Sequence, residues 1–318
     1  MTPTISVVMP VFNASRYLAS AIESVRQQSF SDWELLCIDD GSSDGSRELV
    51  QDFVSRDSRI RLVACPHRGI VATLNEGVRL CRAEFIARLD ADDLALPNRF
   101  QLQLDYLRRA PTLAMMGGAY QTIDAGDCVW KTQYPPQSSA EIRLALQHSN
   151  CIAHSSVMIR REILERFQGP YRAHFPLAED YDLWLRMAAE YAIGSCPAII
   201  LQYRRDLETT KPERIVQQTL STLGVQLSNI FRTNGDPDRA ADWKQLDQAT
   251  LLSEGLSQSS VHKSIRRALL SEARLARKYG FKNKAAQLIE FATRYQPKLE
   301  GLLPQLDFQW RRARAWFA

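Results

Sequence analysis

Short apolar runs alternate with longer amphipathic segments over the N-terminal two thirds of this chain. Four runs are rich in β-branched and apolar side chains, as buried strands of a parallel sheet are: 5–12 (ISVVMPVF), 33–38 (WELLCI), 59–65 (RIRLVAC) and 84–90 (EFIARLD). Between these runs, apolar residues recur at helical spacing, as at Leu18, Ile22 and Val25 and at Ile70, Leu74 and Val78. This alternation predicts βαβ units with right-handed crossovers.

The pattern changes after Pro97. We expect a helix through Phe100, Leu104 and Leu107, two strands in 113–134 around the turn DAGD at 124–127, a helix near 139–148, a strand at 155–160 and a helix from Glu179. From Lys211 onward strand patterns disappear, and apolar residues from Val216 to Ile230 follow helical spacing. The prediction is an α/β domain with a mostly parallel sheet over 1–210, followed by an α-helical region over 211–318.

Composition narrows the class of protein. Apolar residues make up 45% of the 318 residues and charged residues 24%, as in globular proteins. There is no apolar run long enough for a transmembrane helix and no signal-peptide pattern at the start, so we expect a cytoplasmic protein. The six cysteines show no CxxC spacing and indicate neither a zinc site nor a disulfide framework. Nothing in the pattern indicates a nucleic-acid partner.

Two acidic clusters follow predicted strands. One is Asp39-Asp40-Gly41 after the second strand, and the other is Asp90-Ala91-Asp92-Asp93 after the fourth. Either cluster alone also fits a solvated acidic loop. Ligands of open parallel sheets bind beyond the carboxyl ends of the strands, so the two clusters together predict one site. Alternate carboxylates there suit a hard cation such as Mg²⁺ or Mn²⁺ that also holds phosphates.

Three further segments carry candidate chemistry. Glu179 and Asp180 open a predicted helix, where acids either stabilise the helix dipole or serve as a general base. His154, just before a predicted strand, is a candidate metal ligand or phosphate contact, against a structural role. Arg204 and Arg205 are candidates for diphosphate oxygens, against surface ion pairs.

Five motifs in order resemble glycosyltransferase family 2, which has the Rossmann-like GT-A fold. They are ISVVMPVFNASRYLASAIESVRQQSF, CIDDGSSDGS, ARLDADDLALPNRF, AHSSVMIRR and AEDYDLWLRM, and they span about residues 4–205. The resemblance implies a nucleotide-sugar donor, most simply a UDP-sugar, and a divalent metal, Mn²⁺ or Mg²⁺.

The family's site residues can be carried onto this sequence one by one. The resemblance implies that Pro10, Val11 and Phe12 line the base pocket, that Asp39 bonds the base with Asp40 beside it, and that Arg68 contacts base or ribose. It implies that Asp90 and Asp92 bind ribose and metal and that Asp93 borders the donor sugar. Asp180 matches the catalytic base, with Glu179 beside it.

The chain departs from the family pattern in places. Leu74 precedes Asn75 where an Arg-Asn pair is frequent, and Arg205-Asp206 follows Arg204 where a His is frequent, so diphosphate contacts are the least secure part of the resemblance. The QxxRW motif of processive members is incomplete. These features together favour transfer of one sugar per binding event.

The sequence therefore predicts an inverting glycosyltransferase that acts on a glycan or lipid-linked acceptor in cell-surface polysaccharide synthesis. Two alternatives stay open: a sugar-phosphate nucleotidyltransferase and a non-catalytic protein with the same fold. The first normally has a glycine-rich loop after its first strand, where this chain has PVFNASRY.

The last segment has its own pattern. Residues 262–318 hold 13 Lys or Arg against 4 Asp or Glu, and Leu306, Trp310, Ala313 and Phe317 form an apolar stripe. A basic amphipathic helix of this kind binds a membrane interface or packs on the protein. We expect peripheral contact with the inner membrane face through this tail.

Overall fold

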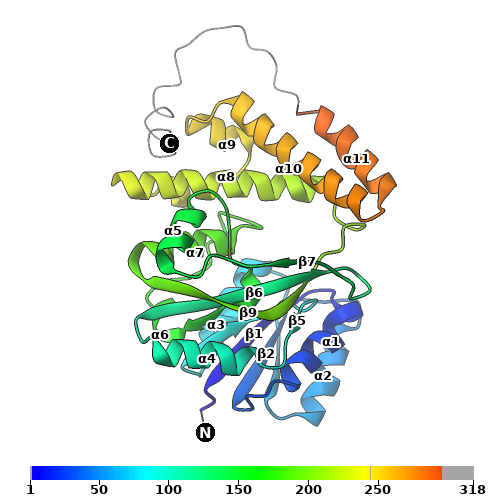
Figure 1. Ribbon diagram of the computed structural model, residues 1–318, viewed down its shortest axis with the longest axis vertical. Helices are drawn as coiled ribbons and strands as arrows, with labels where there is room; N and C mark the ends of the chain where they lie inside the picture. Colours follow the sequence, from blue (N-terminus) through cyan, green and yellow to red (C-terminus); the bar gives the residue numbers. More distant parts are fainter. Residues whose placement is uncertain (1, 244, 296–318) are drawn as a thin grey trace. The chain divides into compact units, whose positions relative to one another are not determined.

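The computed structural model describes residues 2–243 and 245–295 (Figure 1). The elements in chain order are β1 (Ile5–Val11), α1 (Ser15–Arg26), β2 (Trp33–Asp39), α2 (Ser46–Arg56), β3 (Ile60–Ala64), α3 (Ile70–Leu80), β4 (Phe85–Arg88), β5 (Leu94–Ala95), α4 (Arg99–Arg109), β6 (Leu113–Ile123), β7 (Val129–Gln133), α5 (Ser139–Leu146), η1 (His154–Ser156), β8 (Met158–Arg160), α6 (Arg161–Leu164), α7 (Glu179–Glu190), β9 (Ala192–Arg204), α8 (Pro212–Asn234), η2 (Arg239–Asp242), α9 (Gln248–Ser253), α10 (Gln258–Lys278) and α11 (Lys282–Thr293).

One sheet organises the first part of the chain. Its strand order is β3-β2-β1-β4-β8-β6-β9-β5, with β7 paired to β6. The four N-terminal strands are parallel to one another, as the βαβ alternation predicts. Beyond β4 the sheet is mixed, because β8 runs antiparallel to both β4 and β6 while β6 and β9 are parallel.

The predicted strand at 155–160 is shorter than expected. Residues 154–156 form a turn of 3₁₀-helix, and the strand begins at Met158. The hydroxyl of Ser156 and the backbone N–H of the same residue both bond the carbonyl of Ala153, which closes the turn. The turn places Ser155 behind the loop that follows β4.

The sheet is covered on both faces. Ile5, Val7 and Met9 of β1 belong to one core with the apolar residues of α1, α2 and α4. Val8 points to the other face, where α3 packs. The packing there is close, because a Cβ added at Gly77 would lie 2.5 Å from a methyl carbon of Val8.

The chain forms two compact units, one ending at Asp247 and one beginning at Gln248. The sequence prediction placed the boundary at 210/211, but α8 packs against α7 within the first unit. All described elements after residue 211 are helices, and in the second unit α10 and α11 pack on each other.

Among the described residues, each helix is either too short or too polar to cross a membrane. The predicted amphipathic tail, with Leu306, Trp310 and Phe317, lies outside the described residues.

Candidate functional site

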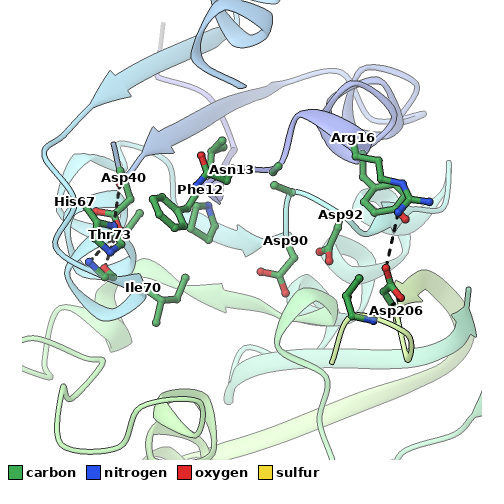
Figure 2. Close-up of a pocket in the computed structure, with 17 residues that line it drawn as sticks. Phe12, Asn13, Arg16, Asp40, His67, Ile70, Thr73, Asp90, Asp92 and Asp206 are labelled. Carbon is green, nitrogen blue, oxygen red and sulfur yellow. Dashed lines mark hydrogen bonds and ion pairs between the residues drawn. The ribbon is translucent and has the colours of Figure 1, made fainter. Parts of the chain in front are cut away.

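Five loops at the carboxyl ends of strands enclose a cavity of about 490 Å³ (Figure 2). The loops follow β1, β2, β3, β4 and β9, which is the rim where ligands of open α/β sheets bind. The lining residues are Pro10, Val11, Phe12, Asn13, Ala14, Arg16, Tyr17, Asp40, His67, Gly69, Ile70, Thr73, Asp90, Ala91, Asp92, Asp206 and Thr209. Of the residues predicted from sequence, the cavity brings together Pro10, Val11, Phe12, Asp40, Asp90 and Asp92.

One end of the cavity is an aromatic platform. The rings of Phe12 and His67 are stacked, with centroids 4.4 Å apart and planes 20° apart, and about half of the Phe12 side chain is exposed. Asp40 holds His67 in place, with Oδ2 2.8 Å from the ring Nδ1. The carboxylate also accepts hydrogen bonds from the backbone N–H groups of Arg68 and Gly69, at 2.8 and 2.9 Å. A flat apolar surface beside a carboxylate suits a nucleobase.

Asp39 does not face this cavity, contrary to the prediction from the family resemblance. Its side chain is fully buried and accepts two hydrogen bonds from the Arg47 guanidinium, at 2.6 and 2.8 Å. The reason is the alternation of side chains along β2: Asp39 lies on the same face as Leu35 and Cys37, which pack into the core under α1 and α2. Of these two neighbouring aspartates, Asp40 is the one that lines the cavity.

Arg68 also lies outside the set of lining residues. Its side chain is exposed, and its contribution to the site is the backbone N–H that bonds Asp40.

Asn13 and His67 are lining residues that the sequence prediction missed. The Asn13 side chain accepts from the backbone N–H of Ser43 at 2.9 Å, and the Ser42 hydroxyl accepts from the backbone N–H of Asn13 at 3.0 Å. These bonds fasten the loop after β1 to the loop after β2. Asn13 has φ 48°, in the left-handed region. Asn adopts positive φ more readily than most residues, so an Asn directly after the first predicted strand was the sequence feature that could have indicated a turn there.

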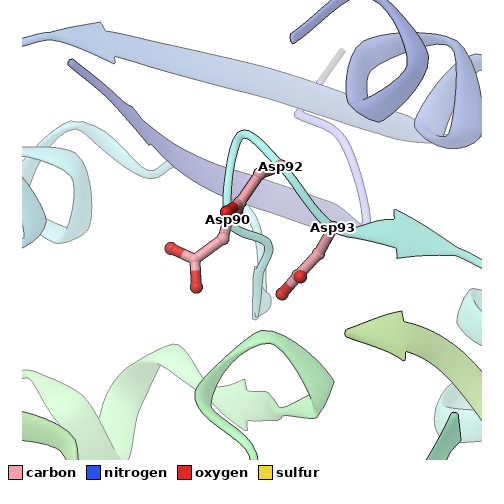
Figure 3. A group of neighbouring side chains, drawn as sticks. All are labelled: Asp90, Asp92 and Asp93. Carbon is pink, nitrogen blue, oxygen red and sulfur yellow. The ribbon is translucent and has the colours of Figure 1, made fainter. Parts of the chain in front are cut away.

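The centre of the site is an acidic loop (Figure 3). Ligand oxygens of Asp90, Asp92 and Asp93 all lie within 4.8 Å of one another. Desolvation and the charge of Asp90 raise the pKa of Asp92 to about 6. The pKa of Asp93 is raised well above its ordinary value, mainly by burial and to a smaller extent by the charges of Asp92 and Asp90. Three carboxylates that repel one another in this way fit a hard divalent cation, which would relieve the repulsion.

Two buried arginines support the acidic loop from behind. Arg88 forms an ion pair with Asp90 and donates to the Ser155 hydroxyl at 2.5 Å. The Ser155 hydroxyl donates to Asp90 at 3.1 Å, which fixes that carboxylate from two sides. Arg99 donates in turn to the carbonyls of Arg88 and Val157, at 2.9 and 3.1 Å. The sequence signal for Arg88 was a basic residue inside an otherwise apolar strand.

Arg204, at the end of β9, forms hydrogen bonds that hold the acidic loop in place. Its backbone N–H donates to Asp93 at 2.7 Å, and its guanidinium donates to the carbonyls of Asp92 and Asp124, at 2.8 and 2.7 Å. The remaining nitrogen pairs with Asp127 at 2.6 Å. Only 2% of the side chain is exposed, so the predicted contact between this guanidinium and a diphosphate is not supported.

The start of α7 carries two carboxylates with unusual surroundings. Glu179 is buried, and its Oε2 has no hydrogen-bond partner among the described residues. Desolvation and the neighbouring charge of Asp180 raise the pKa of Glu179 to about 7. Asp180 accepts a 2.8 Å bond from the Asn150 amide, and burial raises its pKa. Both carboxylates are close enough to Arg88 and Asp90 to feel their charges, although neither lines the cavity.

His154 is not part of the acidic group. It is buried, its Nε2 lies 2.9 Å from the Tyr171 hydroxyl, and its ring meets Trp184 edge-on at 5.7 Å. Burial and the charge of Arg88 hold the pKa of His154 well below its ordinary value. A neutral packing histidine accounts for this geometry, and the predicted metal contact has no support from it.

Comparisons with known proteins identify the family. The family model described as "Glycosyl transferase family 2" matches residues 6–167. An uncharacterized glycosyltransferase of Haemophilus influenzae is 25% identical over 214 residues, which are 64% of this chain and 65% of that protein. The Escherichia coli protein WfgD, named as a UDP-Glc:alpha-D-GlcNAc-diphosphoundecaprenol beta-1,3-glucosyltransferase, is 32% identical over 204 residues, or 63% and 76% of the two chains.

The fold has solved counterparts. The mannosyltransferase PcManGT from Pyrobaculum calidifontis, solved in complex with GDP-Man and Mn²⁺, superposes with a TM-score of 0.57 at 16% identity, covering 99% of this chain and 85% of that one. At this identity the likeness establishes the fold alone.

Proposed function

This chain belongs to glycosyltransferase family 2, and on that premise we propose that it transfers one sugar from a UDP-sugar to a hydroxyl of a glycan or lipid-linked acceptor. The expected setting is cell-surface polysaccharide synthesis, in the cytoplasm and in peripheral contact with the inner membrane face. WfgD, by its name, uses UDP-Glc and a diphosphoundecaprenol-linked sugar.

The observation that carries the proposal is the order of groups along one cavity. The Phe12–His67 platform and Asp40 lie at one end, and Asp90 and Asp92 lie farther along the same wall (Figure 2). A nucleobase stacked at the platform would place its diphosphate toward the acidic loop. The pyrimidine ring of UDP fits a platform made of the six-membered ring of Phe12 and the five-membered ring of His67. Asp40 would be the hydrogen-bond acceptor for the base.

The acidic loop fits a divalent cation, Mg²⁺ or Mn²⁺, held by Asp92 and Asp90 with Asp93 behind them. When bound, such a cation neutralises charge on the diphosphate and so stabilises the leaving group. PcManGT was solved with Mn²⁺, and we extend metal dependence to this chain as part of the proposal.

The chemistry we propose is a single displacement with inversion at the anomeric carbon. The acceptor hydroxyl oxygen forms the new bond to that carbon while the bond to the diphosphate oxygen breaks, and the electron pair leaves with the nucleoside diphosphate. Asp180 takes the hydroxyl proton, and its raised pKa makes it a better base than an exposed aspartate. Asn150 orients the Asp180 carboxylate through its amide.

The alternative functions receive less support from the site. A nucleotidyltransferase needs a phosphate-binding glycine-rich loop after its first strand, and here Phe12 and Asn13 occupy that place. A non-catalytic protein has no need for a carboxylate such as Glu179, buried without a partner among the described residues.

Hydrolysis or transfer from a panel of nucleotide sugars tests the proposal. Purified protein should release UDP from at least one UDP-sugar in the presence of Mn²⁺ or Mg²⁺ and an acceptor mixture of membrane lipids. The absence of sugar release from every UDP-, GDP- and dTDP-sugar, with the protein folded and binding UDP, would favour the non-catalytic alternative.

A further inference from the structure

Helix α10 has one strongly basic face. Six of its residues are exposed and basic: Lys263, Arg266, Arg267, Arg274, Arg277 and Lys278, defined here as the α10 basic face. With a helix turning about 100° per residue, the six lie within a sector of about 120°. The buried residues Val261, Ile265, Leu269 and Ala276 lie on the opposite side, where α11 packs.

The charge on this face is not compensated among the described residues of the second unit. Between residues 248 and 295 there are nine Lys or Arg and three Asp or Glu. The single acid of α10, Glu272, lies about 180° from the centre of the α10 basic face. None of the six basic side chains forms an ion pair with a residue that the structure describes. Like charges at i, i+3 and i+4 destabilise a helix slightly, so this pattern does not help α10 to fold.

The length and straightness of the α10 basic face indicate what kind of partner it binds. From Lys263 to Lys278 the stripe is about 22 Å long, at 1.5 Å per residue, which is longer than one phosphate or one nucleoside diphosphate. It is straight, because it follows a single helix. Helix α10 contains no Phe, Tyr or Trp on which a nucleic-acid base could stack. A flat array of phosphates is the complementary surface.

We propose that the α10 basic face binds the anionic surface of a phospholipid bilayer, with the helix lying parallel to the membrane. Each Lys or Arg near such a surface strengthens binding about five-fold, and the attraction is screened by salt. This contact assigns a surface to the peripheral membrane contact of the proposed function and rests on that part of it, but it does not depend on sugar transfer, which UDP binding and transfer assays measure separately. It is also separate from the predicted tail, which lies beyond the described residues.

Vesicle flotation with the full-length protein tests the proposal. The probe is a vesicle of phosphatidylcholine mixed with phosphatidylglycerol, and vesicles of phosphatidylcholine alone are the neutral reference. We expect the wild-type protein to float with the anionic vesicles and to lose binding as salt is raised. The triple variant Arg266→Glu, Arg267→Glu, Arg274→Glu should lose at least about 100-fold in partition coefficient.

The matched control is Arg108→Glu, Arg109→Glu, Arg143→Glu, which changes net charge equally at exposed arginines of α4 and α5. It should bind anionic vesicles within about three-fold of wild type, because the proposal places the contact on α10 and not on α4 or α5. UDP affinity should be equal in all three proteins. If the glutamate variant does not fold, the corresponding glutamine variant replaces it, with an expected loss of about 100-fold.

Four outcomes would overturn the proposal: no flotation of the wild-type protein, equal binding to neutral vesicles, equal loss in the control variant, or unchanged binding in the α10 variant. A fifth is tighter binding of single-stranded RNA than of vesicles through the same three arginines, which would assign the face to a different polyanion.

Discussion

The carboxylates at the start of α7 have different surroundings, and this difference can be tested one residue at a time. Asp180→Asn should abolish sugar transfer while UDP affinity stays within about three-fold of wild type, because the amide keeps the shape but accepts no proton. Glu179→Gln should retain measurable transfer. Initial-rate kinetics and calorimetry with UDP measure the two effects. If Glu179→Gln is the inactive variant and Asp180→Asn is active, the base is Glu179.

Glu179 also predicts a pH dependence of stability. Its pKa is about 7 in the folded protein, above the ordinary value of 4.5, so the folded state holds this proton more tightly than the unfolded state. The free energy of unfolding should therefore fall as pH rises from about 4.5 through 7, by up to about 3 kcal/mol. Glu179→Gln should flatten this part of the profile in urea unfolding. A profile of the same slope in both proteins would refute the assignment.

The acidic loop predicts metal-dependent donor binding. Mn²⁺ or Mg²⁺ should tighten UDP binding by at least about ten-fold, because the carboxylates otherwise repel the diphosphate. Asp92→Asn should remove most of that gain and, because it removes one of the repelling charges, leave metal-free UDP binding equal to or slightly tighter than that of wild type. Calorimetry with added metal and with EDTA measures this. Equal UDP affinity under the two conditions would exclude a metal at this loop.

At the scale of elements, a buried ion network fastens α7 to α8. Asp182 on α7 is fully buried and bonds Arg172 at 2.8 Å and Arg186 at 2.9 Å. Asp238 pairs with Arg172, which precedes α7, at 2.7 Å and with Arg232 on α8 at 2.8 Å. Because Glu179 and Asp180 begin the same helix, this network fixes the end of the site that holds the proposed base.

Removing one charge from the network should be costly. Asp182→Asn should lower the free energy of unfolding by about 3–5 kcal/mol, since it removes a fully buried charge and leaves the largely buried Arg186 without a carboxylate partner among the described residues and Arg172 with Asp238 alone. The exposed pair of Asp52 and Arg56 supplies the control, and Asp52→Asn should cost less than about 0.5 kcal/mol. Urea midpoints compare the two variants. Equal effects would mean that the network contributes little to holding α7.

At the scale of the whole molecule, the donor cavity belongs entirely to the first unit. All of its lining residues lie between Pro10 and Thr209, and the unit ends at Asp247. A chain ending at Asp247 should therefore bind UDP within about three-fold of the full chain. A chain ending at residue 210 should unfold at lower urea concentration, because it lacks α8 with Arg232, one partner of Asp182, and also lacks Asp238, one partner of Arg172. Urea unfolding and calorimetry with UDP check the two statements, and equal stability of the two fragments would contradict the role given to α8.

Much of this architecture follows from local pattern. Apolar runs and helical spacing are properties of neighbouring residues, so they predicted the βαβ order, the parallel strands β1 to β4, and the acidic clusters at strand ends. The family assignment and the GT-A fold are confirmed by the comparisons. The alternation along β2 also contained the signal that Asp39 faces the core, which the family resemblance misassigned.

Tertiary structure alone decided which charges meet. Arg204 and Asp92 are far apart in sequence and are joined because β9 returns beside β5, and Arg88 meets Ser155 because β8 inserts beside β4. The boundary after Asp247 likewise depends on α8 packing against α7. Spacing along the chain determines which faces are apolar, but burial and ion pairing depend on neighbours that folding brings from elsewhere, and these neighbours set the pKa of Glu179 and the environment of His154.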